Sequence, residues 1–174
     1  MDNIHNYAGS MMSAMELPST VEWGMHCCWL LAQTPPDSPL PRRRLAEFYG
    51  LPEPYLAKAL KALVNAGILV ATTGPRGGYL LARPAEKITA LDVVIAVDGD
   101  TEMFRCTEIR QRGPVGLSPG QCRRSCGIAS LMHNAETAWR NELAATTIAD
   151  LLTSSAMGSR SRATKWLGTL AARS

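Results

Sequence analysis

The sequence predicts a mostly α-helical protein with one small β-hairpin and a long helix near the C-terminus. Three observations support this fold class. Apolar residues recur at spacings of three and four in several segments, which is typical of amphipathic helices. Two β-prone runs in residues 68–84, "ILVATTGPRGGYLLARP", are joined by a Gly/Pro-rich tip, which indicates a hairpin. Residues 128–152 carry a long apolar stripe, which predicts the helix near the C-terminus.

Composition limits the class of protein. With 174 residues, 46% of them hydrophobic, the chain is long enough for one globular domain with a helical extension. The formal net charge of +3 permits nucleic-acid binding without requiring it. We find no apolar run of membrane-spanning length and no secretory signal in the first 20 residues. We therefore expect a cytoplasmic protein without membrane partners, whose thiols bind metals or act in redox chemistry rather than form structural disulfides.

The N-terminal part should contain an extension and a buried helix. Residues 1–18 are polar and Met-rich, and we expect a flexible N-terminal extension there. The following "STVEWGMHCCWLLAQT" carries apolar residues around most of its circumference, which predicts a largely buried helix. Ser19 and Glu22 have the spacing of a capping box, so Glu22 could serve only to cap this helix.

Two further helices should follow, separated by a tight turn. "RRRLAEFYG" (42–50) predicts a short helix with a basic start and a glycine stop. "LPEPYLAKALKALVNAG" (51–67) predicts a longer helix with Pro54 in its first turn and Gly67 as a left-handed cap. After the hairpin, Thr89 and the residues up to 99 predict a capped helix. Two helices, a turn and a glycine-tipped hairpin are the order of a winged helix-turn-helix domain, which we place at residues 19–99.

This order of elements suggests how residues of the domain could bind double-stranded DNA. The start of the short helix could bind phosphates, and the longer helix could enter the major groove with its N-terminal end first. The glycine-rich wing tip could lie along the minor groove, where a cation meets negative potential. The same residues could instead form ordinary solvated surfaces. The candidate DNA-binding residues are Arg42, Arg43, Arg44, Pro54, Tyr55, Lys58, Lys61 and Arg76.

Three of the five cysteines lie in residues 100–127, a Gly/Pro-broken segment that we name the cysteine loop. Cys106, Cys122 and Cys126 are one ligand short of a four-coordinate metal site and one more than a disulfide needs. Thiolates suit iron–sulfur clusters or zinc, although structural zinc sites usually show two CxxC-like pairs. Alternatively, Cys122 and Cys126 are free thiols.

The segment "RRRLAEFYGLPEPYLAKALKALVNAGILVATTGPRGGYLLARPAEKITALDVVIAVDG" resembles the winged-helix domain of bacterial iron–sulfur transcription regulators typified by IscR and NsrR. The resemblance covers roughly residues 20–150. It implies a homodimer that binds an operator with dyad symmetry. It also implies that the helix at 128–152 joins the subunits and that a cluster lies in the cysteine loop at 100–127. We expect the remaining residues, 153–174, to form a loosely ordered tail, within which "TKWLGTLAA" could form a short helix.

The cysteine loop departs from the usual family pattern, because fifteen residues separate Cys106 from Cys122. Glu22 and His26, in "VEWGMHCC", are four residues apart and would project from the same face of a helix. Together with "FRCTEI", this pattern resembles RsrR-type redox regulators of streptomycetes within the family. That resemblance implies a [2Fe–2S] cluster held by Cys106 and Cys126 of one subunit and by Glu22 and His26 of the partner. Cys122 is then a spare thiol, and Cys27 and Cys28 are buried packing residues.

Several alternatives stay open. All three loop cysteines could bind the cluster with one further ligand, Glu22, His26 or His133, in a sensor of nitric oxide or of iron–sulfur supply. The protein could also be a metal-free dimeric DNA-binding or adaptor protein. An enzyme with a nucleophilic Cys122 or Cys126 would need a substrate pocket and a third orienting group, which the sequence does not indicate. We therefore expect neither an enzyme nor a small-molecule substrate.

Overall fold

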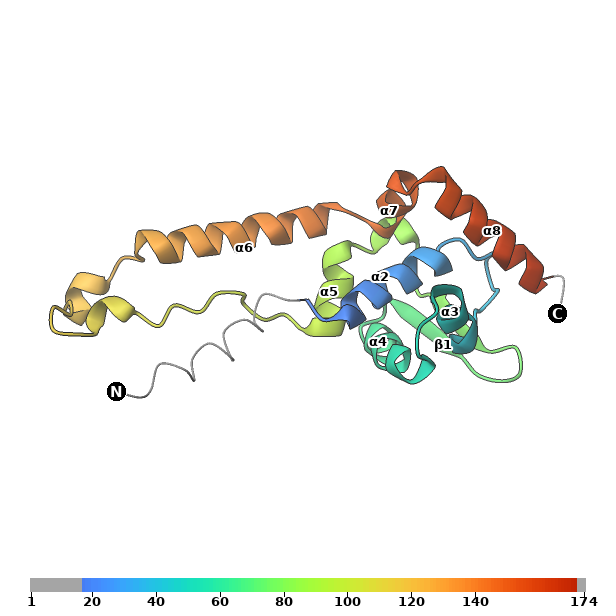
Figure 1. Cartoon of the computed structure of the whole chain (residues 1–174), viewed down its shortest axis with the longest axis horizontal. Helices are drawn as coiled ribbons and strands as arrows, with labels where there is room; N and C mark the ends of the chain where they lie inside the picture. Colours follow the sequence, from blue (N-terminus) through green and yellow to red (C-terminus); the bar gives the residue numbers. More distant parts are fainter. Residues whose placement is uncertain (1–16, 172–174) are drawn as a thin grey trace. The chain divides into compact units, whose positions relative to one another are not determined.

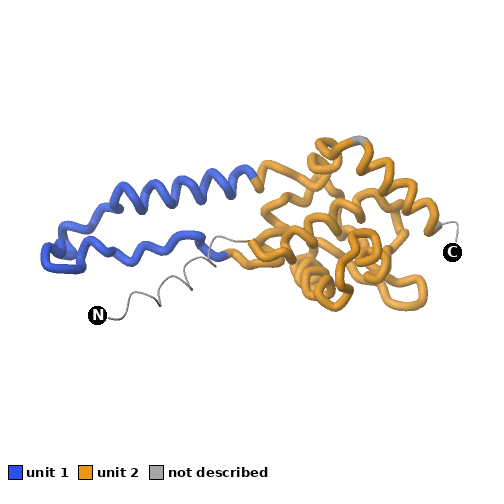
Figure 2. The backbone as a smooth tube through the Cα atoms, viewed as in Figure 1, with its two compact units in different colours: residues 1–16, 101–142 blue, residues 17–100, 143–174 orange. Residues whose placement is uncertain are grey.

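The computed structural model describes residues 17–171, so most of the predicted N-terminal extension lies outside the described residues. Figure 2 colours two compact units within the chain. The smaller unit, as far as it is described, comprises residues 101–142. The larger unit combines residues 17–100 with residues 143–171. Among the described helices, none is both long and apolar enough to span a bilayer.

The larger unit is helical apart from one β-hairpin, as predicted (Figure 1). Its two strands are antiparallel, with Leu69 opposite Leu81 and Thr72 opposite Gly78. Leu40 and Tyr79 exchange two backbone hydrogen bonds of 3.0 Å, which fix the hairpin to the segment just before the helix that begins at Arg42. The elements are α2 (Ser19–Leu31), α3 (Arg42–Tyr49), α4 (Glu53–Asn65), β1 (Leu69–Thr72), β2 (Gly78–Leu81), η2 (Ala85–Lys87), α5 (Ala90–Asp98), α7 (Ile148–Ser154) and α8 (Met157–Ala171).

Helix α2 lies at the centre of this unit and packs against α4, α5, α7 and β2. Its buried residues include Cys27 and Cys28, which are fully inaccessible and confirm their predicted role in packing. Burying one leucine or a residue of similar size contributes about 2 kcal/mol, so this core is the main source of stability. The other large, fully buried side chains are Leu30, Leu45, Leu56, Leu60, Leu63, Ile68, Leu69, Ile88, Val93 and Ile148.

Local signals placed most helix ends correctly. Helix α3 stops at Gly50 with φ 63°, and Gly67 after α4 has φ 66°, a backbone conformation that glycine adopts at low cost. Thr89 and Asp92 form the capping box of α5. The capping box expected at Ser19 is wrong, because Pro18 occupies the N-cap position and makes no side-chain cap. Ser19 is therefore already helical, and Glu22 is not engaged in capping.

The C-terminal segment differs from the loosely ordered tail predicted for residues 153–174. The predicted long helix ends as α6 (Gly127–Ala145), after which Thr147 caps α7 with a capping box. Helix α8 follows, and its residues pack against the core. The ring of Trp166 lies 4.9 Å from that of Phe48, and the Trp29 indole donates a 2.9 Å hydrogen bond to Ser155. These contacts with distant residues order a segment whose composition alone indicates disorder.

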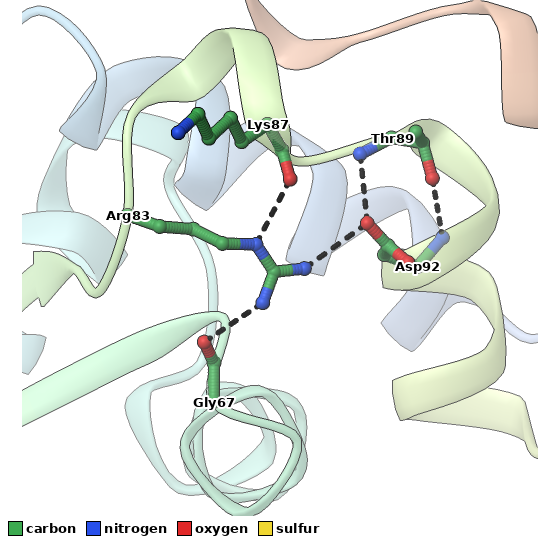
Figure 3. A network of polar contacts seen from close by, with 5 residues as sticks. All are labelled: Gly67, Arg83, Lys87, Thr89 and Asp92. Carbon is green, nitrogen blue, oxygen red and sulfur yellow. Dashed lines mark hydrogen bonds and ion pairs between the residues drawn. The ribbon is translucent and has the colours of Figure 1, made fainter.

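Arg83 connects three elements of the larger unit (Figure 3). Its guanidinium donates hydrogen bonds to the carbonyl of Gly67 at 3.1 Å and to the carbonyl of Lys87 at 2.9 Å. It also bonds the carboxylate of Asp92 at 3.0 Å, and Asp92 in turn accepts from the backbone N–H of Thr89. The end of α4, the exit from the wing and the start of α5 are therefore held by one side chain.

We expect Arg83→Met to lower the free energy of unfolding by about 2 kcal/mol, because two backbone carbonyls and Asp92 lose a charged donor. Urea denaturation followed by circular dichroism would measure this change. Arg76→Met, at the exposed wing tip, is the matched control and should change stability by less than about 0.5 kcal/mol. Equal midpoints for the two variants would contradict the structural role of Arg83.

Candidate metal centre and nucleic-acid interface

Glu22 and His26 lie one turn apart on the exposed side of α2. Both line a cavity of about 890 Å³ in the larger unit, which we name the α2 cavity. Its apolar walls include Met25, Trp29 and Leu151, and α8 contributes Ser159 and Arg162. The Glu22 carboxylate and the His26 imidazole therefore line the same cavity, which is large enough to receive other groups. Their four-residue spacing predicted that they share one face of the helix.

Tyr49, the last residue of α3, fixes the position of His26. The Tyr49 hydroxyl donates a 2.7 Å hydrogen bond to the backbone carbonyl of His26. The two rings are also in contact, with centroids 5.1 Å apart and planes tilted by 51°. Burial raises the pKa of Tyr49, and the neighbouring Cys27 and Cys28 raise it further. The hydroxyl consequently stays protonated at ordinary pH and remains a donor.

The two cysteines of α2 are buried thiols with raised pKa values. Burial raises the pKa of the Cys28 thiol to about 12, and burial together with the adjacent Cys28 raises that of Cys27 further. At neutral pH both are uncharged thiols that pack like small apolar side chains. Neither therefore offers a thiolate to a metal in this conformation.

The three loop cysteines differ from them in exposure and neighbours. Cys106 is exposed, Cys122 ends the short helix η4 (Pro119–Cys122), and Cys126 immediately precedes α6. The Sγ of Cys126 accepts a hydrogen bond of 3.3 Å from the backbone N–H of Ala129. This bond places Cys126 at the N-terminal end of α6, which carries partial positive charge.

Arg110 organises the cysteine loop around these thiols. Its guanidinium makes two hydrogen bonds to the carboxylate of Glu108, at 2.7 and 2.9 Å, and one of 3.1 Å to the carbonyl of Arg124. The hydrogen bonds to Glu108 raise the pKa of Arg110, and Cys122 and Cys126 are close enough to raise it slightly more. Arg110 thus places a permanent positive charge beside two sulfur atoms.

The described part of the chain does not bring together a complete metal site. Within residues 17–171, no three His, Cys, Asp or Glu side chains lie close enough together to hold a metal ion. Glu22 and His26 belong to the larger unit, whereas the loop cysteines belong to the smaller one. His133 is exposed on α6, and its ring lies 5.9 Å from that of Phe104. The donor types suit an iron–sulfur cluster as two half-sets that different chains could join.

The basic start of α3 is partly engaged in ion pairs. Arg42 bonds Glu53 at 2.8 Å, and Arg44 bonds Glu47 at 2.7 Å. Arg43 is exposed at the same helix end, which carries the positive pole of the helix dipole. To bind DNA phosphates as predicted, Arg42 and Arg44 would therefore each have to exchange a carboxylate partner for a phosphate.

Helix α4 and the wing expose the other predicted DNA-binding residues. Pro54 lies in the first turn of α4, and Tyr55 beside it is 67% exposed. Lys58 and Lys61 are exposed further along the same helix, and Arg76 is exposed at the wing tip. These side chains can approach a nucleic acid without rearrangement of the core.

The Rrf2 family, described as iron-dependent transcriptional regulators, matches residues 17–154. The chain belongs to the Rrf2 family. It is 30% identical to YffB of Lactococcus lactis over 70% of this chain and 77% of that protein. It is 28% identical to the transcriptional repressor NsrR of Streptomyces coelicolor, over 67% and 73% of the two chains. The fold resembles that of CymR, the global cysteine regulator of B. subtilis, with a TM-score of 0.64 over 82% of this chain and 99% of that one, at 22% identity.

Membership of the Rrf2 family identifies a DNA-binding transcription regulator rather than an enzyme, and it confirms the winged-helix fold class. Sequence reasoning missed Tyr49, Arg83 and Trp166. Each acts through a partner distant in sequence, and only its residue type could have drawn attention to it. The match to the family ends at residue 154, before α8 begins.

The burial of two thiols predicts a reactivity pattern for this Rrf2 protein. Iodoacetamide at pH 8 should alkylate Cys106, Cys122 and Cys126 in the metal-free protein and spare Cys27 and Cys28. At that pH a thiol of pKa about 12 is ionised in roughly one molecule in ten thousand, and burial also blocks access. Peptide mass spectrometry would read out each site, and full alkylation in urea is the control. Rapid labelling of Cys27 in the folded protein would contradict this packing.

Proposed function

We propose that this protein is a homodimeric redox-sensing regulator in which a [2Fe–2S] cluster controls binding to a dyad-symmetric operator. The ligands are Cys106 and Cys126 of one subunit with Glu22 and His26 of the other. The observation that carries this proposal is the exposed Glu22–His26 pair, which lines a cavity. Among residues 17–171, no third His, Cys, Asp or Glu lies close enough to this pair to complete a metal site.

The chemistry of the donors supports the assignment. A bound cluster would supply a one-electron redox centre, and ligation by histidine in place of cysteine raises the potential of such centres. Cys126 lies at the N-terminal end of α6, and Arg110 adds positive charge nearby. Glu22 is free of the capping role that would have competed with ligation.

The same domain carries the DNA-binding surface. In the proposed complex, α4 enters the major groove with Tyr55, Lys58 and Lys61, and the basic start of α3 contacts phosphates. Arg76 on the wing lies in the minor groove. Two copies related by a dyad would read half-sites about 34 Å apart, one turn of the double helix. Because α2 packs directly against α4, a change at Glu22 and His26 can reach the recognition helix through the core.

A second ligand set deserves a test because Arg110 lies near both Cys122 and Cys126. In this set all three loop cysteines bind the cluster with one further ligand from α2 or His133. The protein would then sense nitric oxide or iron–sulfur supply. Cys122→Ala separates the two sets, since it removes a ligand only in the second.

A mixed dimer would test whether the ligands come from two chains. We expect the Glu22→Ala/His26→Ala protein and the Cys106→Ala/Cys126→Ala protein each to purify without a cluster. A dimer of one chain of each, isolated by two different affinity tags, contains one complete ligand set. It should hold about half the iron of the wild-type dimer and about half its visible absorbance.

Two outcomes of the mixed-dimer experiment would overturn the assignment. A colourless mixed dimer would show that the four ligands do not divide between chains in this way. Cluster retention by the Glu22→Ala/His26→Ala protein alone would remove both residues from the site. In parallel, loss of the cluster in Cys122→Ala would favour the second ligand set.

The DNA interface predicts a salt dependence. Lys58→Ala should weaken operator binding and lower the slope of log affinity against log salt by about one, because one positive charge that neutralises the DNA in the major groove is lost. The operator would first be selected from random duplex DNA with the wild-type protein, and affinities measured by fluorescence anisotropy. Lys87→Ala removes an exposed lysine from η2, outside the predicted interface, and is the control. Equal slopes for both variants would exclude Lys58 from the interface.

A further inference from the structure

Tyr49 lies between the proposed ligand His26 and the turn that leads to the recognition helix. We propose that Tyr49 is the positioning residue that couples His26 to the helix-turn-helix. This coupling rests on the proposed ligand role of His26, which the mixed dimer tests separately.

The contact between Tyr49 and His26 has two components. The hydroxyl donates to the backbone carbonyl of His26 at 2.7 Å, although 23 positions separate the two residues in sequence. This bond fixes the last residue of α3 to the middle of α2. The phenol ring also contacts the imidazole, with centroids 5.1 Å apart and planes tilted by 51°, and this contact restricts the imidazole's rotation on that side. A change in the position of His26 therefore meets Tyr49 through both backbone and ring.

After Tyr49, a short and conformationally restricted turn connects α3 to α4. Gly50 follows in a left-handed conformation, and the N–H of Leu51 bonds the carbonyl of Ala46 at 2.9 Å. Pro52, with its restricted φ, precedes the first residue of α4. A displacement of Tyr49 is consequently passed to α4 rather than absorbed in a flexible loop.

Helix α8 contacts Tyr49 indirectly, through Phe48. Phe48 meets the Tyr49 ring edge-on at 4.8 Å, and it meets Trp166 of α8 at 4.9 Å. The four rings of His26, Tyr49, Phe48 and Trp166 form a continuous series of contacts from α2 through α3 to α8. Aromatic pairs of this geometry resist displacement, because their edge-to-face contacts add to the stabilisation that burial alone gives.

The test uses the full-length protein loaded with its cluster. For wild type, Tyr49→Phe and Tyr49→Leu, operator affinity would be measured for the oxidised and reduced forms at one salt concentration. We expect the ratio of the two affinities to fall by about fivefold or more in Tyr49→Leu, and by less in Tyr49→Phe, which keeps the ring. Tyr79→Phe, which removes a phenolic hydroxyl elsewhere in the same domain, should keep the wild-type ratio.

A second measurement tests the contact without the cluster. In the metal-free protein, the ring-proton NMR signals of His26 should shift in Tyr49→Leu, because the ring current of the phenol is lost, and stay in place in Tyr79→Phe. An unchanged affinity ratio in a cluster-loaded Tyr49→Leu protein would overturn the coupling alone. A wild-type protein that binds no cluster would overturn the proposed function and the coupling together, even if the NMR shift is seen.

Discussion

The packing of α2 is the constraint on which the rest of the larger unit depends. One face of this helix fills the core with Cys27, Cys28 and Leu30, while the opposite face presents Glu22 and His26 to a cavity. Because interiors are close-packed, the helix cannot rotate or slide without displacing side chains of α4 and α5. The candidate ligands are therefore placed by the same contacts that place the recognition helix. Tyr49 adds a direct contact between His26 and the end of α3.

The larger unit is built from two distant parts of the chain. Ile148 bonds the carbonyl of Ile88 at 2.9 Å, and Ala90 bonds that of Thr146 at 2.8 Å. These backbone bonds return the chain to the domain that it left near residue 100. The cysteine loop and most of α6 therefore form an excursion that is anchored at both ends. Such an excursion can present its thiols to another molecule while the domain that binds DNA stays folded.

Much of the fold follows from local signals, whereas the contacts of the site do not. Periodicity and glycine positions predicted α3, α4 and the hairpin, because each of these depends on residues a few positions apart. The expected cap at Ser19 failed because Pro18 already occupies the N-cap position. The tail was misjudged because its order depends on Phe48 meeting Trp166, a contact across more than a hundred residues. Periodicity placed Glu22 and His26 on one face, but it carries no information about the Tyr49 hydroxyl that holds His26.

A divided ligand set would also make cluster binding a property of the dimer. Neither half-set can satisfy four coordination positions, so in the proposed arrangement each cluster binds only where two chains meet. Binding that occurs only in the dimer stabilises the dimer by mass action. Glu22 and His26 would then be exposed to solvent when the chains separate, while the contacts of His26 with Tyr49 stay within the chain. In the proposed arrangement, buried contacts would supply the stability of the fold, and the exposed candidate ligands would remain available to a partner chain.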